Sequence, residues 1–135
     1  MPSFTVPAVA RITGLAPQLL VADLDQAVAY YRDRLGFTLD FTYDDFYASV
    51  SRDGFAIHLK HGPSRPDERA WRKQEEHLDA YVAVTGIRAL FEELRQRGAT
   101  VVKPLADRPW GCLDFYVEDP DGHLLCFSEL VADGA

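Results

Sequence analysis

A pattern that occurs twice along the chain constrains the fold more than any other feature. Each copy has an apolar run, then an amphipathic helix that ends at a glycine, then three further apolar runs. The first helix ends at Gly36 and the second at Gly98, and glycine often follows a helix because it tolerates a left-handed backbone. One copy alone could not bury its own sheet face. The pattern therefore predicts two strand-helix-strand-strand-strand modules that pack together and leave a concave surface.

The first module is expected over residues 12–62. Residues 15–22 ("LAPQLLVA") predict a short buried strand, and residues 24–35 predict a helix with one apolar stripe. Asp23 before this helix and Gln26 three residues later resemble a capping box. Further strands are expected at residues 37–41, 46–52 and 55–61, with the strong hairpin signal Asp53-Gly54 between the last two.

The second module is expected over residues 77–131, after a connecting segment at residues 63–76. Residues 79–84 predict a strand, Thr85 is a plausible cap, and residues 87–97 predict a helix. The module should continue with strands at residues 100–104 and on both sides of the turn Asp119-Pro120-Asp121-Gly122. The polar stretch 61–76 disfavours a helix, so it is interpreted as a linker or as a loop that covers something.

Composition narrows the class of protein. A chain of 135 residues that is 47% hydrophobic suits one α+β domain spanning residues 1–135. The net charge of −7 and the lack of a basic face argue against nucleic-acid binding. No run of about 18 apolar residues is present to span a membrane. The N-terminal stretch "MPSFTVPAVARITG" does not resemble a secretory signal, and Cys112 and Cys126 lack a C-x-x-C spacing. These features predict a cytoplasmic protein with reduced thiols.

Three segments carry a resemblance to a known superfamily. They are "LLVADLDQAVAYYRDRLGF", "GIRALFEELRQRGA" and "FYVEDPDGHLLCF". The chain resembles the vicinal oxygen chelate superfamily, which includes glyoxalases, extradiol dioxygenases and bleomycin-resistance proteins, over most of residues 12–131. The resemblance implies two tandem βαβββ modules that form a curved sheet around a concave cavity.

Within this superfamily the bleomycin-resistance branch is the most similar. The segments "TYDDFYASVSRDG" and "RPWGCLDFYVEDPDG" carry this likeness. It implies an antibiotic-resistance protein that is homodimeric, metal-free and non-catalytic. Such a protein holds a cationic glycopeptide in clefts at the subunit interface, against aromatic side chains and an acidic surface.

The metal-ligand positions of the superfamily's enzymes are only partly matched. By resemblance they fall on Ala16, which has no donor atom, and on His58, Asp79 and Cys126, where the last two replace the usual His and Glu. Gln18, two residues from Ala16 on the same strand face, could substitute for it. Oxygen chemistry favours N and O ligands, and a thiolate there would be open to oxidation. We therefore expect no metal and no cofactor. The alternative is a divalent-metal lyase, isomerase or dioxygenase that uses His58, Asp79 and Cys126.

Aromatic residues point towards ligand binding. Trp110 stands in the Pro- and Gly-bracketed loop "RPWG", where an exposed tryptophan favours ligand contact, and it matches a tryptophan that lines the drug cleft in the resembling proteins. Phe41, Phe46, Tyr47 and Tyr81 are further candidates for which core packing is an equally good explanation.

Polar residues on the expected cavity face complete the candidate site. A buried Asp79 would need a partner, either His58, Lys60 or a cationic ligand. His58 is predicted to contact the ligand or to be an ordinary hydrogen-bonded histidine. Cys126 could equally be a small buried hydrophobe. The three other histidines, His61, His77 and His123, are expected to be solvated.

The predicted function is sequestration of a small molecule without metal or catalysis. Flat aromatic groups would stack on Trp110 and Tyr81, while Asp79 and the negative field would favour a cation. The ligand could be a bleomycin-type glycopeptide or another metabolite. A structural or interaction module with a vestigial cavity is the remaining alternative.

Overall fold

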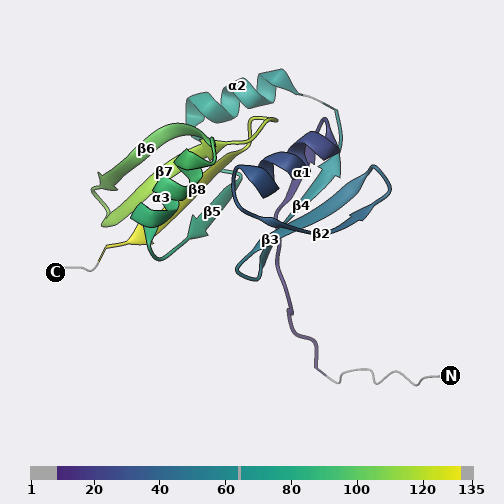
Figure 1. Ribbon diagram of the computed structural model, residues 1–135, viewed down its shortest axis with the longest axis horizontal. Coiled ribbons are helices and arrows are strands. Elements are labelled where there is room, and N and C mark those ends of the chain that lie inside the picture. Colours follow the sequence, from purple (N-terminus) through teal and green to yellow (C-terminus); the bar gives the residue numbers. More distant parts are fainter. Residues whose placement is uncertain (1–8, 64, 132–135) are drawn as a thin grey trace.

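The structure is a computed structural model that describes residues 9–63 and 65–131 (Figure 1). The elements, in chain order, are β1 (Gln18–Val21), α1 (Leu24–Asp33), β2 (Thr38–Tyr43), β3 (Tyr47–Arg52), β4 (Phe55–His61), α2 (Pro66–Glu75), β5 (Ala80–Ala83), α3 (Ile87–Gln96), β6 (Thr100–Arg108), β7 (Cys112–Glu118) and β8 (Leu124–Leu130).

The two modules have the same topology, as the repeated pattern predicted. The first forms a sheet in the order β1-β4-β3-β2, called sheet A here, and the second forms sheet B in the order β5-β8-β7-β6. In each sheet the first and last strands of the module pair in parallel and the other pairs are antiparallel. The predicted α+β class and the tandem βαβββ arrangement are therefore confirmed, and each module forms a sheet of its own.

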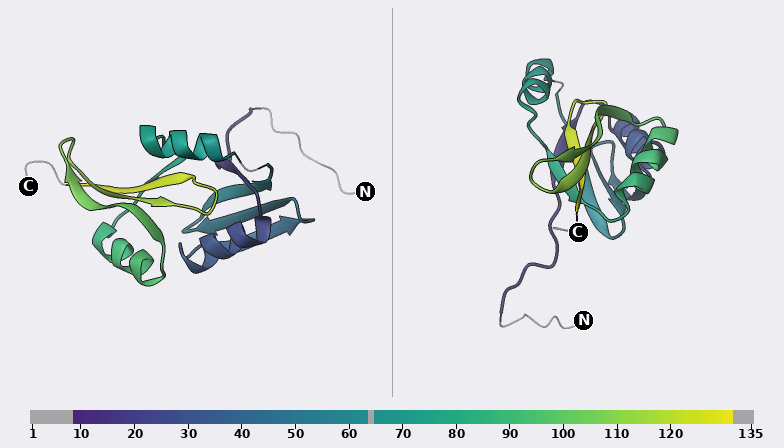
Figure 2. Two further views of the ribbon diagram at one scale, coloured as in Figure 1. Left: turned by 90° about the horizontal axis from the view of Figure 1, so that it is seen from above. Right: turned by 90° about the vertical axis from the view of Figure 1, so that its left-hand side faces the viewer.

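Helices α1 and α3 lie on one side of the two sheets and α2 lies on the other (Figure 2). Helix α1 begins as predicted, since the Asp23 side chain accepts a hydrogen bond from the Gln26 amide at 3.0 Å. Its apolar stripe buries Ala27 and Tyr31 among residues of sheet A such as Val50 and Leu59. This packing leaves the opposite face of sheet A uncovered by α1.

The predicted hairpin at Asp53-Gly54 is confirmed. Both residues have positive φ angles, 53° and 84°, which is the backbone that a two-residue turn between twisted strands requires. Strands β3 and β4 pair across it from Arg52 and Phe55 up to Tyr47 and Lys60.

The expectation that residues 61–76 form no helix is wrong, because α2 occupies Pro66–Glu75. Proline has no amide hydrogen to donate, so it costs nothing in the first turn, where that group would be unpaired. Acidic residues follow in the first turn and basic residues stand in the last, which complements the helix dipole. Arg72 also lies 3.7 Å from Glu68, one turn away. Favourable residues at the two helix ends and charge pairs thus stabilise α2, although the helix has no buried apolar stripe.

The predicted cap at Thr85 is also wrong. The N-cap of α3 is Gly86, with φ of 75° and no capping side chain of its own. The carboxylate of Glu129 accepts the hydrogen bond of the Ile87 amide at 2.9 Å instead. A residue on β8 therefore satisfies the start of α3, which local sequence does not reveal.

One hydrophobic core spans both modules and contains buried residues of both sheets and of α1 and α3. Polar contacts join the modules at its edge, among them the pairing of Arg52 with Glu93 at 2.8 Å. No helix in the described part of the chain is long and apolar enough to cross a membrane. The interpretation of the N-terminal stretch as no secretory signal falls partly on residues 1–8, which lie outside the described residues.

Candidate functional site

The face of sheet A that turns away from α1 carries polar and aromatic side chains. Alternation along the strands places Gln18, Tyr47, His58 and Lys60 on this face, while their neighbours point into the core. Phe41 on the edge strand β2 is half exposed and its ring meets the imidazole of His58 edge-on. We call this surface the open face of sheet A.

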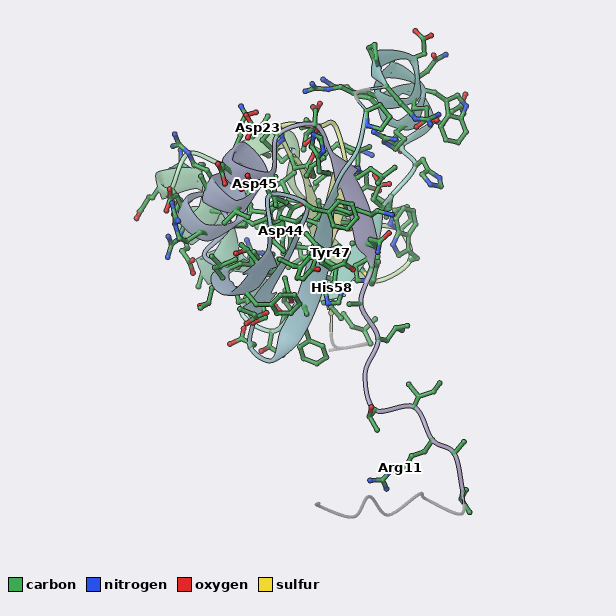
Figure 3. The ribbon with its side chains drawn as sticks, turned by 90° about the vertical axis from the view of Figure 1, so that its right-hand side faces the viewer. Arg11, Asp23, Asp44, Asp45, Tyr47 and His58 are labelled. Carbon is green, nitrogen blue, oxygen red and sulfur yellow. The ribbon has the colours of Figure 1, made fainter. Side chains whose placement is uncertain are left out.

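A hydrogen-bond chain crosses the open face of sheet A. The amide nitrogen Nε2 of Gln18 donates to the hydroxyl of Tyr47 at 2.9 Å. The same hydroxyl lies 2.8 Å from Nδ1 of His58. Figure 3 shows Tyr47 and His58 side by side, with Asp44 and Asp45 close by in the turn that precedes Tyr47. His58 is therefore held in place by protein groups at one nitrogen only, among the residues described.

Phe46 lies at the end of the same face. Its ring, 44% exposed, stands under the ammonium of Lys60, whose Nζ is 5.5 Å from the ring centroid. The predicted candidates Phe41, Phe46 and His58 thus lie on one surface and are only partly covered.

The equivalent face of sheet B is more closed. Tyr81 is 61% exposed, but its partner in the sheet, Cys126, is only 1% exposed. The Arg108 guanidinium pairs with the buried Asp114 carboxylate at 2.6 Å. Burial, with the charge of Asp114, raises the pKa of the Cys126 thiol to about 12. Cys126 therefore stays a neutral, buried thiol at ordinary pH.

Trp110 lies in the turn between β6 and β7, where it is 67% exposed. The turn is held by hydrogen bonds from Gly111 N to Arg108 O at 3.0 Å and from Val131 N to Gly111 O at 2.9 Å. An exposed indole on a fixed turn suits stacking against a flat group. The predicted exposure of Trp110 agrees with the structure.

Asp79 has protein partners that the sequence did not suggest. Its carboxylate accepts the Leu124 amide at 3.0 Å and lies 3.6 Å from the Arg72 guanidinium on α2. Neither His58 nor Lys60 is among its partners. The buried carboxylate that needed a partner is therefore satisfied within its own module and by α2.

The pairing of the first and last strands of each module differs from what the metal-ligand positions of the superfamily suggested. Gln18, and not Ala16, stands beside His58, and Tyr81, and not Asp79, stands beside Cys126. Alternation gave the correct faces but not the register along them.

His58, Asp79 and Cys126 do not fit a metal site within one chain. His58 belongs to sheet A, Cys126 belongs to sheet B, and Asp79 is already paired with Arg72. Across residues 9–63 and 65–131, no three His, Cys, Asp or Glu side chains are grouped in a way that could hold a metal ion.

His123 was expected to be solvated, and this expectation is wrong. It is 5% exposed, and its Nδ1 lies 2.8 Å from Oδ2 of the buried Asp119. The Tyr31 hydroxyl donates to the same oxygen at 2.8 Å, and Oδ1 accepts the amides of Asp121 and His123. Burial alone lowers the pKa of His123, but the hydrogen bond and charge of Asp119 raise it overall. Burial and Asp119 likewise raise the pKa of Tyr31. We call Tyr31, Asp119 and His123 the junction network.

A pocket of about 320 Å³ lies between α2, strand β1 and the turn at residues 119–122, and Gln18 is part of its lining. Arg72, Asp79 and His123 line it, and all three already have partners in the protein. Arg69 of α2 crosses the turn, since a Cβ at Gly122 would overlap its side chain, and it pairs with the buried Glu118. The charged groups at this pocket therefore mostly fasten α2 to the second module.

Sequence reasoning did not identify the link between Gln18, Tyr47 and His58. Gln18 was considered only as a substitute metal ligand, and Tyr47 only as an aromatic candidate. The hairpin signal at Asp53-Gly54 contained the missing information. It fixes the register of β3 on β4, and that register brings Tyr47 diagonally next to His58.

A family model and curated relatives both match this chain. The family model described as the Glyoxalase/Bleomycin resistance protein/Dioxygenase superfamily matches residues 9–127. Bleomycin resistance proteins of Geobacillus stearothermophilus and Staphylococcus aureus are each 27% identical over 132 residues, which covers 85% of this chain and 95% of theirs.

Solved structures share the fold. A bleomycin-binding protein from the bleomycin producer Streptomyces verticillus, complexed with copper(II)-bleomycin, superposes with a TM-score of 0.67 at 25% identity, covering 93% of this chain and 100% of that one. A glyoxalase-related enzyme from Clostridium phytofermentans gives a TM-score of 0.73 at 20% identity, with 93% and 100% covered. The chain belongs to the glyoxalase/bleomycin resistance protein/dioxygenase superfamily.

Proposed function

We propose that this protein binds and sequesters a small molecule of the bleomycin type, without chemistry on it, on the open face of sheet A and the equivalent face of sheet B. The observation that carries the proposal is the set of exposed aromatic side chains in both modules, Phe41 on β2 and Phe46 in the turn after it, with Tyr81 on β5 and Trp110 in the turn after β6. Exposed aromatic residues that are not needed for the core suit stacking of a flat ligand. The similarity to bleomycin resistance proteins supports the same ligand class.

We propose further that the protein is a homodimer and that the second copy closes the cleft. Within the described part of one chain, α2 is the only helix over the open face of sheet A, near one end of it (Figure 2). Large apolar side chains stay exposed in and near these faces, including Leu20 at 43%, Tyr43 at 66% and Leu130 at 78%. Exposed large apolar side chains favour an interaction site where a partner covers them. A stable interface would have to bury about 1,200 Å² or more in total.

The charge of the protein favours a cationic ligand. The net charge is −7, and Asp44 and Asp45 stand in the turn beside Tyr47 (Figure 3). Since Arg72 partly neutralises Asp79, we assign the attraction of a cation chiefly to these two turn carboxylates. Such attraction is electrostatic and weakens as salt is added.

Isothermal titration calorimetry with a metal-free bleomycin glycopeptide tests the proposal. We expect saturable binding, and the Trp110→Ala variant should lose about 1–2 kcal/mol of binding free energy, or about tenfold in affinity, through the lost stacking. The matched control is Trp71→Ala, which removes an exposed tryptophan of α2 whose ring is tilted against that of His77 and should leave the affinity unchanged. No heat of binding to the parent protein would overturn the ligand class, and equal losses in the two variants would remove Trp110 from the site.

A further inference from the structure

We propose that Gln18 and Tyr47 fix the tautomer of His58, so that Nε2 carries the proton and donates a hydrogen bond to an oxygen acceptor of the ligand. This inference rests on the proposed function for the identity of the ligand only. It concerns a positioning role for Gln18 and Tyr47, and a ligand contact for His58.

The number of protons available in the hydrogen-bond chain from Gln18 through Tyr47 decides the tautomer of His58. Gln18 Nε2 already donates to the Tyr47 oxygen, and a phenol has one proton of its own to give. Among the described residues, its one remaining partner at hydrogen-bond distance is Nδ1 of His58, 2.8 Å away. The hydroxyl therefore donates to Nδ1, which must present its lone pair. In a neutral imidazole the proton is then on Nε2.

The free nitrogen faces the proposed ligand surface. His58 is half-buried on the open face of sheet A, with Phe41 edge-on to its ring, and no hydrogen-bond partner of Nε2 occurs among the described residues. A donor at this place suits a peptide carbonyl oxygen, a carboxamide oxygen or a carboxylate of the ligand. Phe41 and the ring of Tyr47, 5.5 Å from the imidazole, limit the access of water and so strengthen such a bond.

The hydrogen bond that the Gln18 amide donates to Tyr47 selects between the two tautomers of His58. An amide can donate or accept, whereas a carboxylate at the same place only accepts. In a Gln18→Glu variant the Tyr47 hydroxyl would donate to Glu, and its oxygen would then accept from Nδ1–H of His58. The proton would move from Nε2 to Nδ1, and the lone pair of Nε2 would face the ligand. The exposed Gln18 thus decides, through Tyr47, whether Nε2 of His58 donates or accepts a hydrogen bond.

Long-range ¹H–¹⁵N correlation spectra of the imidazole nitrogens, recorded in alkaline buffer where imidazole is neutral, test the inference on the whole protein. A His58→Gln variant identifies the His58 signals among the four histidines. We expect a lone-pair (pyridine-type) Nδ1 and a protonated Nε2 in the parent protein, and the reverse in Gln18→Glu. The control Gln26→Glu makes the same exchange at an exposed position of α1, on the other side of sheet A, and it should keep the parent tautomer.

Three results would overturn the assignment. They are a protonated Nδ1 in the parent protein, an equal mixture of tautomers, or a Gln18→Glu variant without inversion. Metal-free bleomycin is then added to the same sample. Retention of the Nε2 proton, with slower exchange with water, supports the donor contact, and a shift of the proton to Nδ1 overturns it. If the glycopeptide does not bind at all, the proposed function fails while the tautomer of the free protein is still decided by the first spectra.

Discussion

Two histidines of this protein stand in opposite environments, and the contrast separates the proposed binding surface from the framework. His123 lies in the junction network, where Asp119 binds its ring and the Asp119 carboxylate also accepts a bond from Tyr31. His58 lies on the open face of sheet A, where one nitrogen is bound by Tyr47 and the other has no described partner. Both rings are bound at one nitrogen, but His123 is only 5% exposed and binds a buried carboxylate, so it supports the fold. His58 is half-buried beside exposed aromatic side chains, where a ligand can reach it.

The largest effect is expected where the framework is broken. Asp119→Ala removes a carboxylate that accepts hydrogen bonds from the Tyr31 hydroxyl, the amides of Asp121 and His123 and the His123 ring. Leaving these buried donors without an acceptor should lower the free energy of unfolding by about 3 kcal/mol or more. Chemical denaturation monitored by circular dichroism measures it.

The control for this change is a residue beside the proposed binding surface. Asp45→Asn alters an exposed carboxylate in the turn between β2 and β3, and its unfolding free energy should stay within about 0.5 kcal/mol of the parent value. Similar stabilities for Asp119→Ala and Asp45→Asn would show that the junction network is not a framework.

A smaller loss of unfolding free energy is expected when the contacts that attach α2 to the second module are removed. Arg72→Gln removes the contacts of a half-buried guanidinium with Asp79 and with the backbone of the turn at residues 121–122. We expect a loss of about 1–2 kcal/mol and faster amide hydrogen exchange in α2, while α3 is unaffected. Arg65→Gln, which breaks only an exposed pair with Glu68, should change little. Unchanged exchange in Arg72→Gln would mean that α2 is held by other contacts.

A pH dependence is expected for His123. Because its pKa in the folded protein is raised above the ordinary value of 6.5, the folded state binds the proton more tightly than the unfolded state. Its contribution to stability is complete below that value and is lost as the pH rises through the raised pKa. The free energy of unfolding should therefore decrease over this window, and the His123→Gln variant should lack this part of the slope. Identical slopes in both proteins would contradict the prediction.

The sequence predicted the architecture well because the features that determine it are local. Helix-ending glycines, the Asp53-Gly54 hairpin and the turn at residues 119–122 act within a few residues and set the order of strands and helices. The helix at Pro66–Glu75 was missed because it has no buried stripe and depends on end effects and charge pairs. The environment of His123 was missed because Asp119 and Tyr31 come together only through packing of the two modules.

The candidate site was predicted less completely. Exposure of Trp110 followed from its Pro- and Gly-bracketed loop, and alternation placed His58 on the correct face. The contacts of Asp79 depend on α2, and the pairing of Gln18 with His58 depends on a parallel register between β1 and β4, residues about 40 apart in the chain. Long-range register of this kind has no signal in a single sequence.

We expect a ligand to bind the open face of sheet A and the equivalent face of sheet B, and not the pocket beneath α2. Amide chemical-shift mapping by NMR during titration with metal-free bleomycin tests it most directly. We expect the largest shifts around Tyr47, His58 and Tyr81 and at the Trp110 indole, with little change in α2 and at residues 119–123. Shifts confined to α2 and residues 119–123 would place the ligand in the pocket under α2 and contradict the account.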